Sequence, residues 1–418
     1  MRERNNDLRT KLSHNRTFSG QNEEVAAASS GQNREDVLEE ARQLKTQLSD
    51  IEEKEGLLHT EMEGLAAQLP NITSPETPLG KKAKVLWYIN DHPEPVPSLS
   101  DRVWRSHIHI GSELELLDFT AAATTSGWGW YYLTNEAALL EQALVQYALS
   151  VAMKRGWKIV SPPSIVYSHI AAACGFKPRD QNGEQQIYSL QQGKKDQARG
   201  KPELSLAGTA EIPFAGLRAN QMLEEEDLPL KVVGVSRSYR AEAGSRGVDT
   251  KGLYRVHEFT KVEMFSWTMP DEPDSSTSHS ELVFEEMVEI QKEILGALGL
   301  HCRILEMPSA DLGASATRKQ DIEAFFPSRR EKDEGWGEVT SASICTDYQA
   351  RRLGTRVRTE KFGRKTEWPH TANGTAMAVP RVLAALLENG WNEKEMCVRL
   401  PEVLRPWMGG VDVISKKR

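Results

Sequence analysis

One stretch of the sequence constrains the fold more than any other, residues 232–267, VVGVSRSYRAEAGSRGVDTKGLYRVHEFTKVEMFSW. Two segments of β-forming residues flank a loop rich in Gly, Asp and Ser, which predicts an antiparallel hairpin with a long connection. Alternation along the strands places charged and aromatic side chains on one face. They are Arg240 and Glu242 on the first strand, and Arg255, His257, Phe259, Lys261 and Glu263 on the second.

We interpret this polar face as a ligand site. Arg offers a fixed bidentate fork to phosphate, and Phe offers a flat face on which a base can stack. An anionic, planar ligand fits this combination. The alternative is a hairpin whose charged face is merely solvated, which would not explain why arginines gather at matching positions.

Length and composition limit the number of domains and the kinds of partner that we expect. The 418 residues suffice for a large core and a second region, so we expect two domains. With 52 Lys and Arg against 60 Asp and Glu, the net charge is −8, and any nucleic-acid contact must be local. The four cysteines form no CxxC pair, which argues against zinc or a disulfide framework and favours a reducing compartment. No apolar run reaches the roughly 18 residues of a membrane span, and no targeting peptide is visible, so no membrane partner is expected.

Residues 34–69 carry the clearest repeat. Apolar residues recur at alternating spacings of four and three, with a break at Glu55. This spacing predicts a helix of a coiled coil or helical hairpin, with residues 2–18 as a shorter partner. The alternative is an amphipathic helix docked on a globule, but 36 residues would extend about 54 Å, longer than most domains are wide. A Pro-rich linker follows Leu69, so the expected domains are residues 1–80 and 81–418.

The remaining segments alternate between helix and strand signals. Glu338 and Ser341 lie three residues apart in a strand-like segment, and a carboxylate with a hydroxyl suits magnesium. The predicted elements are short β pieces between Val85 and Thr134, a helix over Asn135–Arg155 with Asn135 as N-cap, a proline-bearing strand over 158–166, a solvated basic loop over 191–203, a helix over Glu281–Leu300, and over 370–389 a strand, a small-residue turn and a helix.

Four of these segments resemble the class II aminoacyl-tRNA synthetases, in the form found in seryl-tRNA synthetases. Arg240-Ala241-Glu242 followed by GLYRVHEFTKVE resembles motif 2, and HTANGTAMAVPRVLAALLEN resembles motif 3. The helix and the strand with Pro163 resemble motif 1, while LAGTAEIP resembles the serine-binding loop. The resemblance covers about residues 34–410 and has the bacterial or organellar form.

The resemblance implies an α+β fold, with a mainly antiparallel sheet flanked by helices and preceded by an N-terminal helical hairpin or coiled-coil arm. It implies that L-serine is activated with ATP and Mg²⁺ to seryl adenylate and transferred to the 3′ end of tRNA(Ser). It further implies a homodimer through residues 135–166, in the mitochondrial matrix or, for a bacterium, the cytoplasm. Residues 1–80 would then be a tRNA-binding arm and residues 81–418 the catalytic domain.

The resemblance also assigns residues to roles. The catalytic residues would be Arg240, Glu242 and Arg381. Serine would be bound by Thr209, Ala210, Glu211, Arg240, Glu263 and Thr375. ATP would be bound by Arg240, Ala241, Glu242, Val256, Phe259, Glu338, Val339, Thr340, Ser341 and Arg381, and Mg²⁺ by Glu338 and Ser341. From the residue type alone, Glu211 fits a helix cap equally well.

Four positions depart from the family pattern. Ile344 stands where the family usually has Asn, Thr375-Ala376 where it has Ser-Gly, and Pro380 where it has Gly. Two other functions therefore stay open. One is a ligase that passes an amino acid to a carrier protein, which the heptad repeat disfavours because such ligases lack the arm. The other is a catalytically silent paralogue that binds RNA or protein, which the retained charged residues disfavour.

Overall fold

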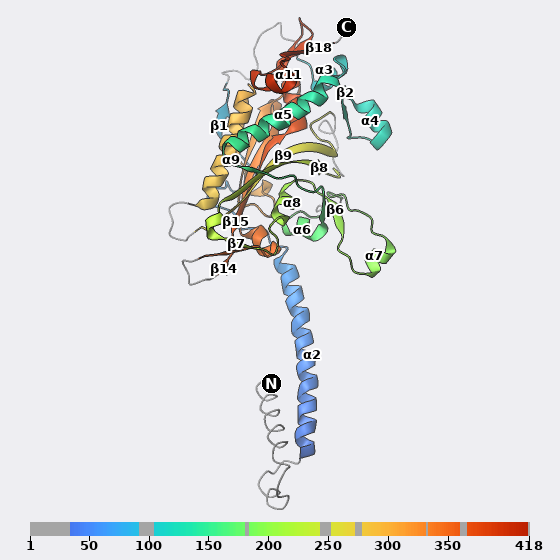
Figure 1. Cartoon of the computed structure of the whole chain (residues 1–418), viewed down its shortest axis with the longest axis vertical. Helices are drawn as coiled ribbons and strands as arrows, with labels where there is room; N and C mark the ends of the chain where they lie inside the picture. The colour runs from blue at the N-terminus through green and yellow to red at the C-terminus, as the bar shows by residue number, and fades with distance from the viewer. Residues whose placement is uncertain are drawn as a thin grey trace, which may run out of the picture. The chain divides into compact units, whose positions relative to one another are not determined.

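The computed structural model describes residues 34–91, 104–179, 184–242, 252–271, 278–331, 333–359 and 366–416 (Figure 1). The chain divides into two compact units between Leu69 and Pro70. The helix predicted at residues 2–18 and the turn at 19–33 lie outside the described residues.

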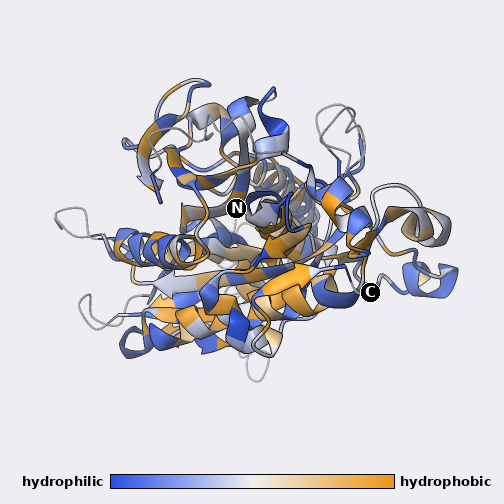
Figure 2. Ribbon diagram, turned by 90° about the horizontal axis from the view of Figure 1, so that it is seen from above, coloured by the Kyte–Doolittle hydropathy of each residue, from blue (hydrophilic) through white to orange (hydrophobic). Residues whose placement is uncertain are grey.

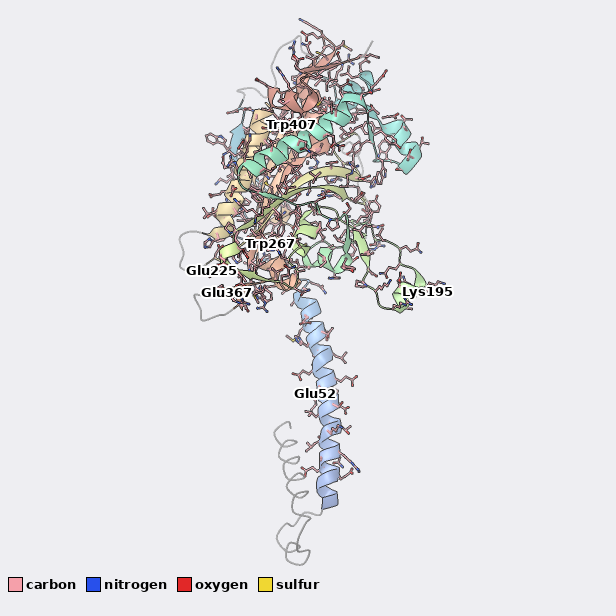
Figure 3. All side chains as sticks on the ribbon, in the orientation of Figure 1. Glu52, Lys195, Glu225, Trp267, Glu367 and Trp407 are labelled. Atoms are coloured by element: carbon pink, nitrogen blue, oxygen red, sulfur yellow. The ribbon has the colours of Figure 1, made fainter. Side chains whose placement is uncertain are left out.

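The first unit contains α2, Arg34–Ala66, the helix that the heptad spacing predicts. Its 33 residues extend about 50 Å at 1.5 Å per residue. Side chains project from it along its length, among them the labelled Glu52 (Figure 3). Apolar residues in the second half of the repeat are exposed, with Ile51 at 46%, Leu58 at 61% and Met62 at 68%. The helix is thus confirmed, whereas its pairing into a hairpin stays a prediction.

The second unit is built on an eight-stranded sheet with the order β1-β10-β11-β12-β15-β9-β8-β4. All neighbours pair antiparallel except β4 with β8, so the prediction of a mainly antiparallel sheet is confirmed. The strands are β1 Lys84–Ile89, β4 Lys158–Ile159, β8 Leu230–Tyr239, β9 Glu258–Thr268, β10 Cys302–Glu306, β11 Arg318–Phe325, β12 Trp336–Thr346 and β15 His370–Ala378.

Three helices cover one face of this sheet: α5 (Asn135–Lys154), α9 (His279–Ala297) and α11 (Val379–Gly390) (Figure 1). On β9, Val262 and Met264 point into this core, and hydrophobic segments concentrate in the middle of the unit (Figure 2). Phe265 and Trp267 point the opposite way, into a second core around α8 (Glu211–Gly216). Alternation therefore leaves Lys261 and Glu263 on the α8 side of the sheet.

Smaller elements fill the connections. They are α3 His107–Glu113, β2 Leu117–Asp118, α4 Phe119–Ser126, β3 Tyr132–Leu133, β5 Ile165–Tyr167, α6 Ser168–Ala173, α7 Lys194–Ala198, β6 Leu204–Leu206, β7 Met222–Glu224, α10 Tyr348–Leu353, β13 Arg356–Arg358, β14 Thr366–Glu367, β16 Trp391–Asn392, β17 Cys397–Arg399 and β18 Val413–Ser415.

Several local predictions were wrong. Residues 85–134 contain two helices, and α4 begins where the Asp118 carboxylate accepts a hydrogen bond from Ala121 N. The proline-bearing strand is two short strands in different sheets, because prolines cannot donate to a ladder. Thr134, not Asn135, is the N-cap of α5, and the Asn135 amide donates to Glu115 O instead. The 191–203 loop contains α7, and β15 continues into α11 without a turn.

Residues 70–80, predicted as a linker, are hydrogen-bonded to the second unit. Asn71 Nδ2 donates to Ser315 O (2.9 Å) and to Cys345 O (2.8 Å). Ser74 N donates to Thr317 O (2.9 Å). These bonds explain why the division falls before Pro70. Within the described ranges, no helix has the length and apolar character needed to cross a membrane.

Candidate active site

The predicted hairpin is confirmed as the centre of the site. β8 and β9 pair from Leu230 opposite Trp267 to Tyr239 opposite Glu258. Arg240 and Glu242 follow β8 directly and line the mouth of a pocket, as does Arg255 just before β9.

His257 does not share the pocket face, so its predicted placement was wrong. Its ring stacks on Trp130, with ring centroids 5.7 Å apart, and its Nδ1 lies 2.9 Å from the Tyr188 hydroxyl. The physical reason is that β9 starts only at Glu258. Strict alternation does not hold for residues before the ladder begins.

One pocket collects most of the predicted residues. It is lined by Arg240, Glu242, Leu253, Tyr254, Arg255, Val256, Phe259, Lys261, Glu338, Val339, Thr340, Ser341, Thr375, Ala378, Pro380 and Arg381. All of these are predicted site residues except Leu253, Tyr254, Arg255, Lys261, Ala378 and Pro380. Five predicted residues do not line it. Ala241 donates its N–H to Gln186 O (3.1 Å), Ala210 is fully buried, and Thr209, Glu211 and Glu263 belong to a neighbouring group described below.

Two arginines, Arg240 and Arg381, line this pocket. The Arg240 guanidinium lies 5.3 Å from the centre of the Phe259 ring. Arg381 NH1 donates to Glu338 Oε2 (3.1 Å), and its Nε donates to Tyr254 O (3.1 Å). Burial and the nearby Arg381 lower the pKa of Arg240. Two neighbouring positive charges of this kind favour the binding of an anion.

A β-bulge brings the two predicted metal ligands together. Residues three apart on a regular strand point to opposite faces. On β12, however, Thr340 pairs with Ile322 and Glu338 with Glu323, so Val339 is the extra residue. Both Glu338 and Ser341 consequently line the pocket. Burial acts to raise the pKa of Glu338, but Arg381, Lys319 and Arg240 lower it to about 2, so the carboxylate is ionised.

A second, buried group of polar residues adjoins the pocket. Lys261 Nζ lies 2.5 Å from Glu263 Oε2 and donates to Thr209 Oγ1 (2.7 Å). Thr375 Oγ1 donates to Glu263 Oε2 over 3.4 Å. Lys261 therefore neutralises Glu263 and links the pocket to the loop that contains Thr209. Sequence reasoning placed Lys261 on this face but gave it no role, although its alternation with Phe259 and Glu263 was a usable signal.

Glu211 lies beside this group and is only 7% exposed. Its carboxylate accepts hydrogen bonds from Gln349 Nε2 (2.7 Å) and Asn373 Nδ2 (3.2 Å). The capping alternative was wrong, because the N-cap of α8 is Ala210 and the Glu211 N–H itself donates to the Thr209 hydroxyl. Burial and the charge on Glu263 raise the pKa of Glu211 to about 7, despite Lys261.

The departures from the family pattern fall in different places. Ile344 is buried in the core beneath the helices, on the side of the sheet away from Lys261 and Glu263. Thr375 and Pro380 line the pocket itself. The Ile344 substitution therefore changes core packing, whereas Thr375 adds a methyl group where a ligand would lie.

Known proteins share this architecture and sequence. Residues 191–390 match the family described as tRNA synthetase class II core domain (G, H, P, S and T). The mitochondrial serine–tRNA ligase of Saccharomyces cerevisiae is 44% identical over 369 residues, which cover 88% of this chain and 77% of the relative. The serine–tRNA ligase of Rhodopirellula baltica is 38% identical, with 94% of this chain and 87% of the relative covered.

A solved structure agrees with these relatives. The seryl-tRNA synthetase of Pyrococcus horikoshii, complexed with ATP, matches with a TM-score of 0.82 and 29% identity, over 100% of this chain and 89% of that one. Fold, sequence and site geometry lead to one family. The chain belongs to the seryl-tRNA synthetases, the class II aminoacyl-tRNA synthetases that act as serine–tRNA ligases.

Proposed function

We propose that the β9 pocket binds ATP next to L-serine and forms seryl adenylate, which is then transferred to the 3′ end of tRNA(Ser). The arrangement of β9 supports this most directly. Phe259 lies beside Arg240 in the pocket that Arg381 also lines, and Lys261 and Glu263 follow at the next positions of the same face. Neighbours on one face of a strand are about 7 Å apart. The strand thus holds an anion-binding half and a carboxylate-lined half at the separation that two reacting small molecules need.

In this proposal the serine carboxylate attacks the α-phosphorus of ATP. A carboxyl oxygen–phosphorus bond forms, the bond to the bridging oxygen breaks, and pyrophosphate leaves. Arg240 holds the α-phosphate and the serine carboxylate, while Arg381 binds the terminal phosphates and Phe259 stacks on adenine. Catalysis is then positioning together with charge stabilisation, as in other phosphoryl-type transfers.

Glu338 and Ser341 fit a magnesium ion that is shared with the substrate. Magnesium in nucleotide sites takes one or two protein oxygen ligands together with phosphate oxygens. The ionised Glu338 and the Ser341 hydroxyl line the same pocket as the two arginines. Among the described residues, no group of three or more His, Cys, Asp or Glu forms a metal site of its own. When bound, Mg²⁺ would neutralise phosphate charge.

Serine would be bound by the buried polar group. With Lys261 neutralising Glu263, Glu211 is the carboxylate that remains for the serine ammonium. Glu263 and Thr375 would then contact the serine hydroxyl. A site with buried polar groups rejects an analogue that lacks the hydroxyl, because those groups would be left unpaired.

We further propose that residues 1–80 comprise a helical tRNA-binding arm and its linker, that residues 81–418 form the catalytic domain, and that two copies associate through residues 135–166. Exposed apolar side chains on the latter segment, Ile159 and Ile165, support the association. The mitochondrial relative in yeast supports a mitochondrial location, and the bacterial relative supports the cytoplasm if the source is a bacterium.

The test is ATP–pyrophosphate exchange with serine, alanine, threonine and glycine, followed by charging of tRNA(Ser). We expect exchange with serine to dominate and tRNA to be charged. Exchange with charging of a carrier protein but not of tRNA would instead support the carrier-protein ligase. A protein that shows no exchange with any amino acid would be the silent paralogue, which the similarity to serine–tRNA ligases disfavours.

A further inference from the structure

A buried histidine–carboxylate pair lies behind the nucleotide half of the pocket. His107, at the start of α3, has its Nδ1 2.8 Å from Glu388 Oε1, and the two residues are 7% and 1% exposed. The other ring nitrogen, Nε2, accepts a hydrogen bond from Leu253 N (3.0 Å). Because Nε2 accepts this bond, Nδ1 carries the proton and donates it to Glu388.

We propose that His107 is a positioning residue of the ATP site, which it serves by holding the backbone at Leu253 and, through it, Tyr254. Both of these residues line the pocket. Tyr254 O accepts from Arg381 Nε, and the Arg381 guanidinium lies 4.7 Å from the centre of the Tyr254 ring. The inference rests on the proposed role of this pocket in binding ATP.

The helix α11 fixes this short segment from two points. Arg381 stands in its first turn and Glu388 seven residues later, so both project from the same side of the helix. Arg381 holds Tyr254 O directly, whereas Glu388 holds Leu253 N through His107. Displacement of His107 would break the hydrogen bond to Leu253 N and let the Leu253–Tyr254 backbone move relative to Arg381.

Glu388 also holds Ser328, whose neighbour Arg329 contacts the Tyr254 ring. The Ser328 backbone N–H (3.0 Å) and hydroxyl (2.8 Å) both donate to the Glu388 carboxylate. Ser328 belongs to the short 3₁₀ helix Pro327–Arg329. The guanidinium of Arg329 lies 4.1 Å from the centre of the Tyr254 ring. The contacts made by Glu388 thus converge on Tyr254 from two directions.

The His107 imidazole is packed so closely against Gly252 that a group added there would displace the ring. Gly252 has a φ of +76°, and a Cβ added there would collide with Nε2 of His107. A buried pair kept only for stability could be replaced by apolar residues of similar volume. That replacement would leave the Leu253 N–H without an acceptor, at the wall of the pocket.

Two amide substitutions of His107 distinguish the hydrogen bond between Nδ1 and Glu388 from the one between Nε2 and Leu253 N. The longer His107→Gln side chain reaches the place of Nε2 and can accept from Leu253, whereas His107→Asn reaches only the place of Nδ1. We expect His107→Asn to raise KM for ATP in pyrophosphate exchange about tenfold, the effect of one lost hydrogen bond. KM for serine should change less than twofold, and His107→Gln should lie closer to the parent. Gly252→Ala, which displaces the imidazole and also strains the backbone before Leu253, should reproduce the ATP-specific loss.

His301→Asn is the matched control. It removes another buried imidazole, whose Nδ1 lies 2.9 Å from Asn90 O, next to β10 and away from the pocket. We expect it to lower Tm without changing KM for ATP. Equal increases in both KM values for His107→Asn, or an Asn variant no worse than the Gln variant, would overturn the proposal. If His107→Asn does not fold, the ratio of the two KM values in His107→Gln and Gly252→Ala decides instead.

Phe259→Ala is measured alongside to separate the two proposals. It should raise KM for ATP more than KM for serine, because base stacking is worth about 1–3 kcal/mol. If Phe259→Ala leaves KM for ATP unchanged, the pocket is not the ATP site and the proposed function of these residues fails. If Phe259→Ala behaves as expected and the His107 variants do not, only the positioning role fails.

Discussion

Arg240 is the residue on which the proposed chemistry depends most. Its guanidinium lies against Phe259, in the pocket that Arg381 also lines. Arg240→Ala should abolish pyrophosphate exchange while leaving the fold intact, because a phosphate contact at the pocket mouth is lost without opening the core. Arg356→Ala is the matched control, since Arg356 lies 3.4 Å from the centre of the Trp368 ring, outside the pocket. Exchange at the parental rate in Arg240→Ala would exclude its assigned role.

If Glu211 binds the serine ammonium as proposed, serine binding should depend on pH. Burial and Glu263 raise its pKa from the usual 4.5 to about 7, so the folded protein holds this proton more tightly than the unfolded chain. Its contribution to stability is therefore present below pH 4.5 and is lost as the pH rises towards 7. The proposed serine binding should depend on pH in the opposite direction and strengthen as the pH rises, because the ammonium group of serine needs the ionised Glu211 carboxylate.

We therefore expect kcat/KM for serine to rise with pH up to about 7 and to level off above it. Glu211→Gln should abolish this rise and leave a low, flat profile, while KM for ATP stays nearly constant in both proteins. The measurement is pyrophosphate exchange at saturating ATP across this pH range. A rise that persists unchanged in the Gln variant would assign the titration to another group.

At the scale of elements, alternation and motif spacing predicted the hairpin, α2, α9 and the strand that contains Glu338. These predictions were correct because each signal is local: a strand face or the apolar seam of a helix is defined by residues a few positions apart. They failed for His257, which precedes the ladder, and could not foresee the bulge at Val339, because a register shift depends on the neighbouring strand. The residues Gln349 and Glu211 are 138 positions apart in the sequence, so no local pattern predicts their contact.

The helix α10 supplies the next prediction, because it places Gln349 beside Glu211 in the proposed serine site. Gln349 Nε2 donates to Glu211, and Gln349 Oε1 accepts from the Thr371 hydroxyl on β15 (2.8 Å). This bond to the carboxylate opposes the raised pKa of Glu211. Gln349→Leu should therefore move the rise in kcat/KM for serine to higher pH and weaken serine binding, with little effect on KM for ATP.

Gln349→Glu is the companion variant. It adds a second carboxylate beside Glu211, and the repulsion should shift the pH profile further than the Leu variant does. Thermal unfolding of both variants controls for the loss of a buried hydrogen bond, which costs about 1–3 kcal/mol. A pH profile identical to that of the parent in both variants would contradict the proposed influence of Gln349 on Glu211.

On the scale of the whole molecule, the chain contains two units of different character. The second unit has the large core and the pocket, whereas α2 in the first exposes part of its apolar repeat. Four Lys and Arg stand against ten Asp and Glu in α2. Uniform attraction to RNA phosphates is therefore not available to this helix. Docking would depend on its length and shape and on a few basic side chains, among them Arg42 and Lys45.

The last prediction follows from this division. Deletion of residues 1–69 should leave serine-dependent pyrophosphate exchange nearly unchanged, because every residue proposed to bind ATP and serine lies in the second unit. Aminoacylation of tRNA(Ser) should fall by a large factor, mainly through a higher KM for tRNA. The full-length variant with Arg42→Glu and Lys45→Glu should show a smaller loss of the same kind, since two phosphate contacts are replaced by repulsion. Unchanged charging by the deleted protein would mean that the arm does not bind tRNA, and the carrier-protein alternative would gain support.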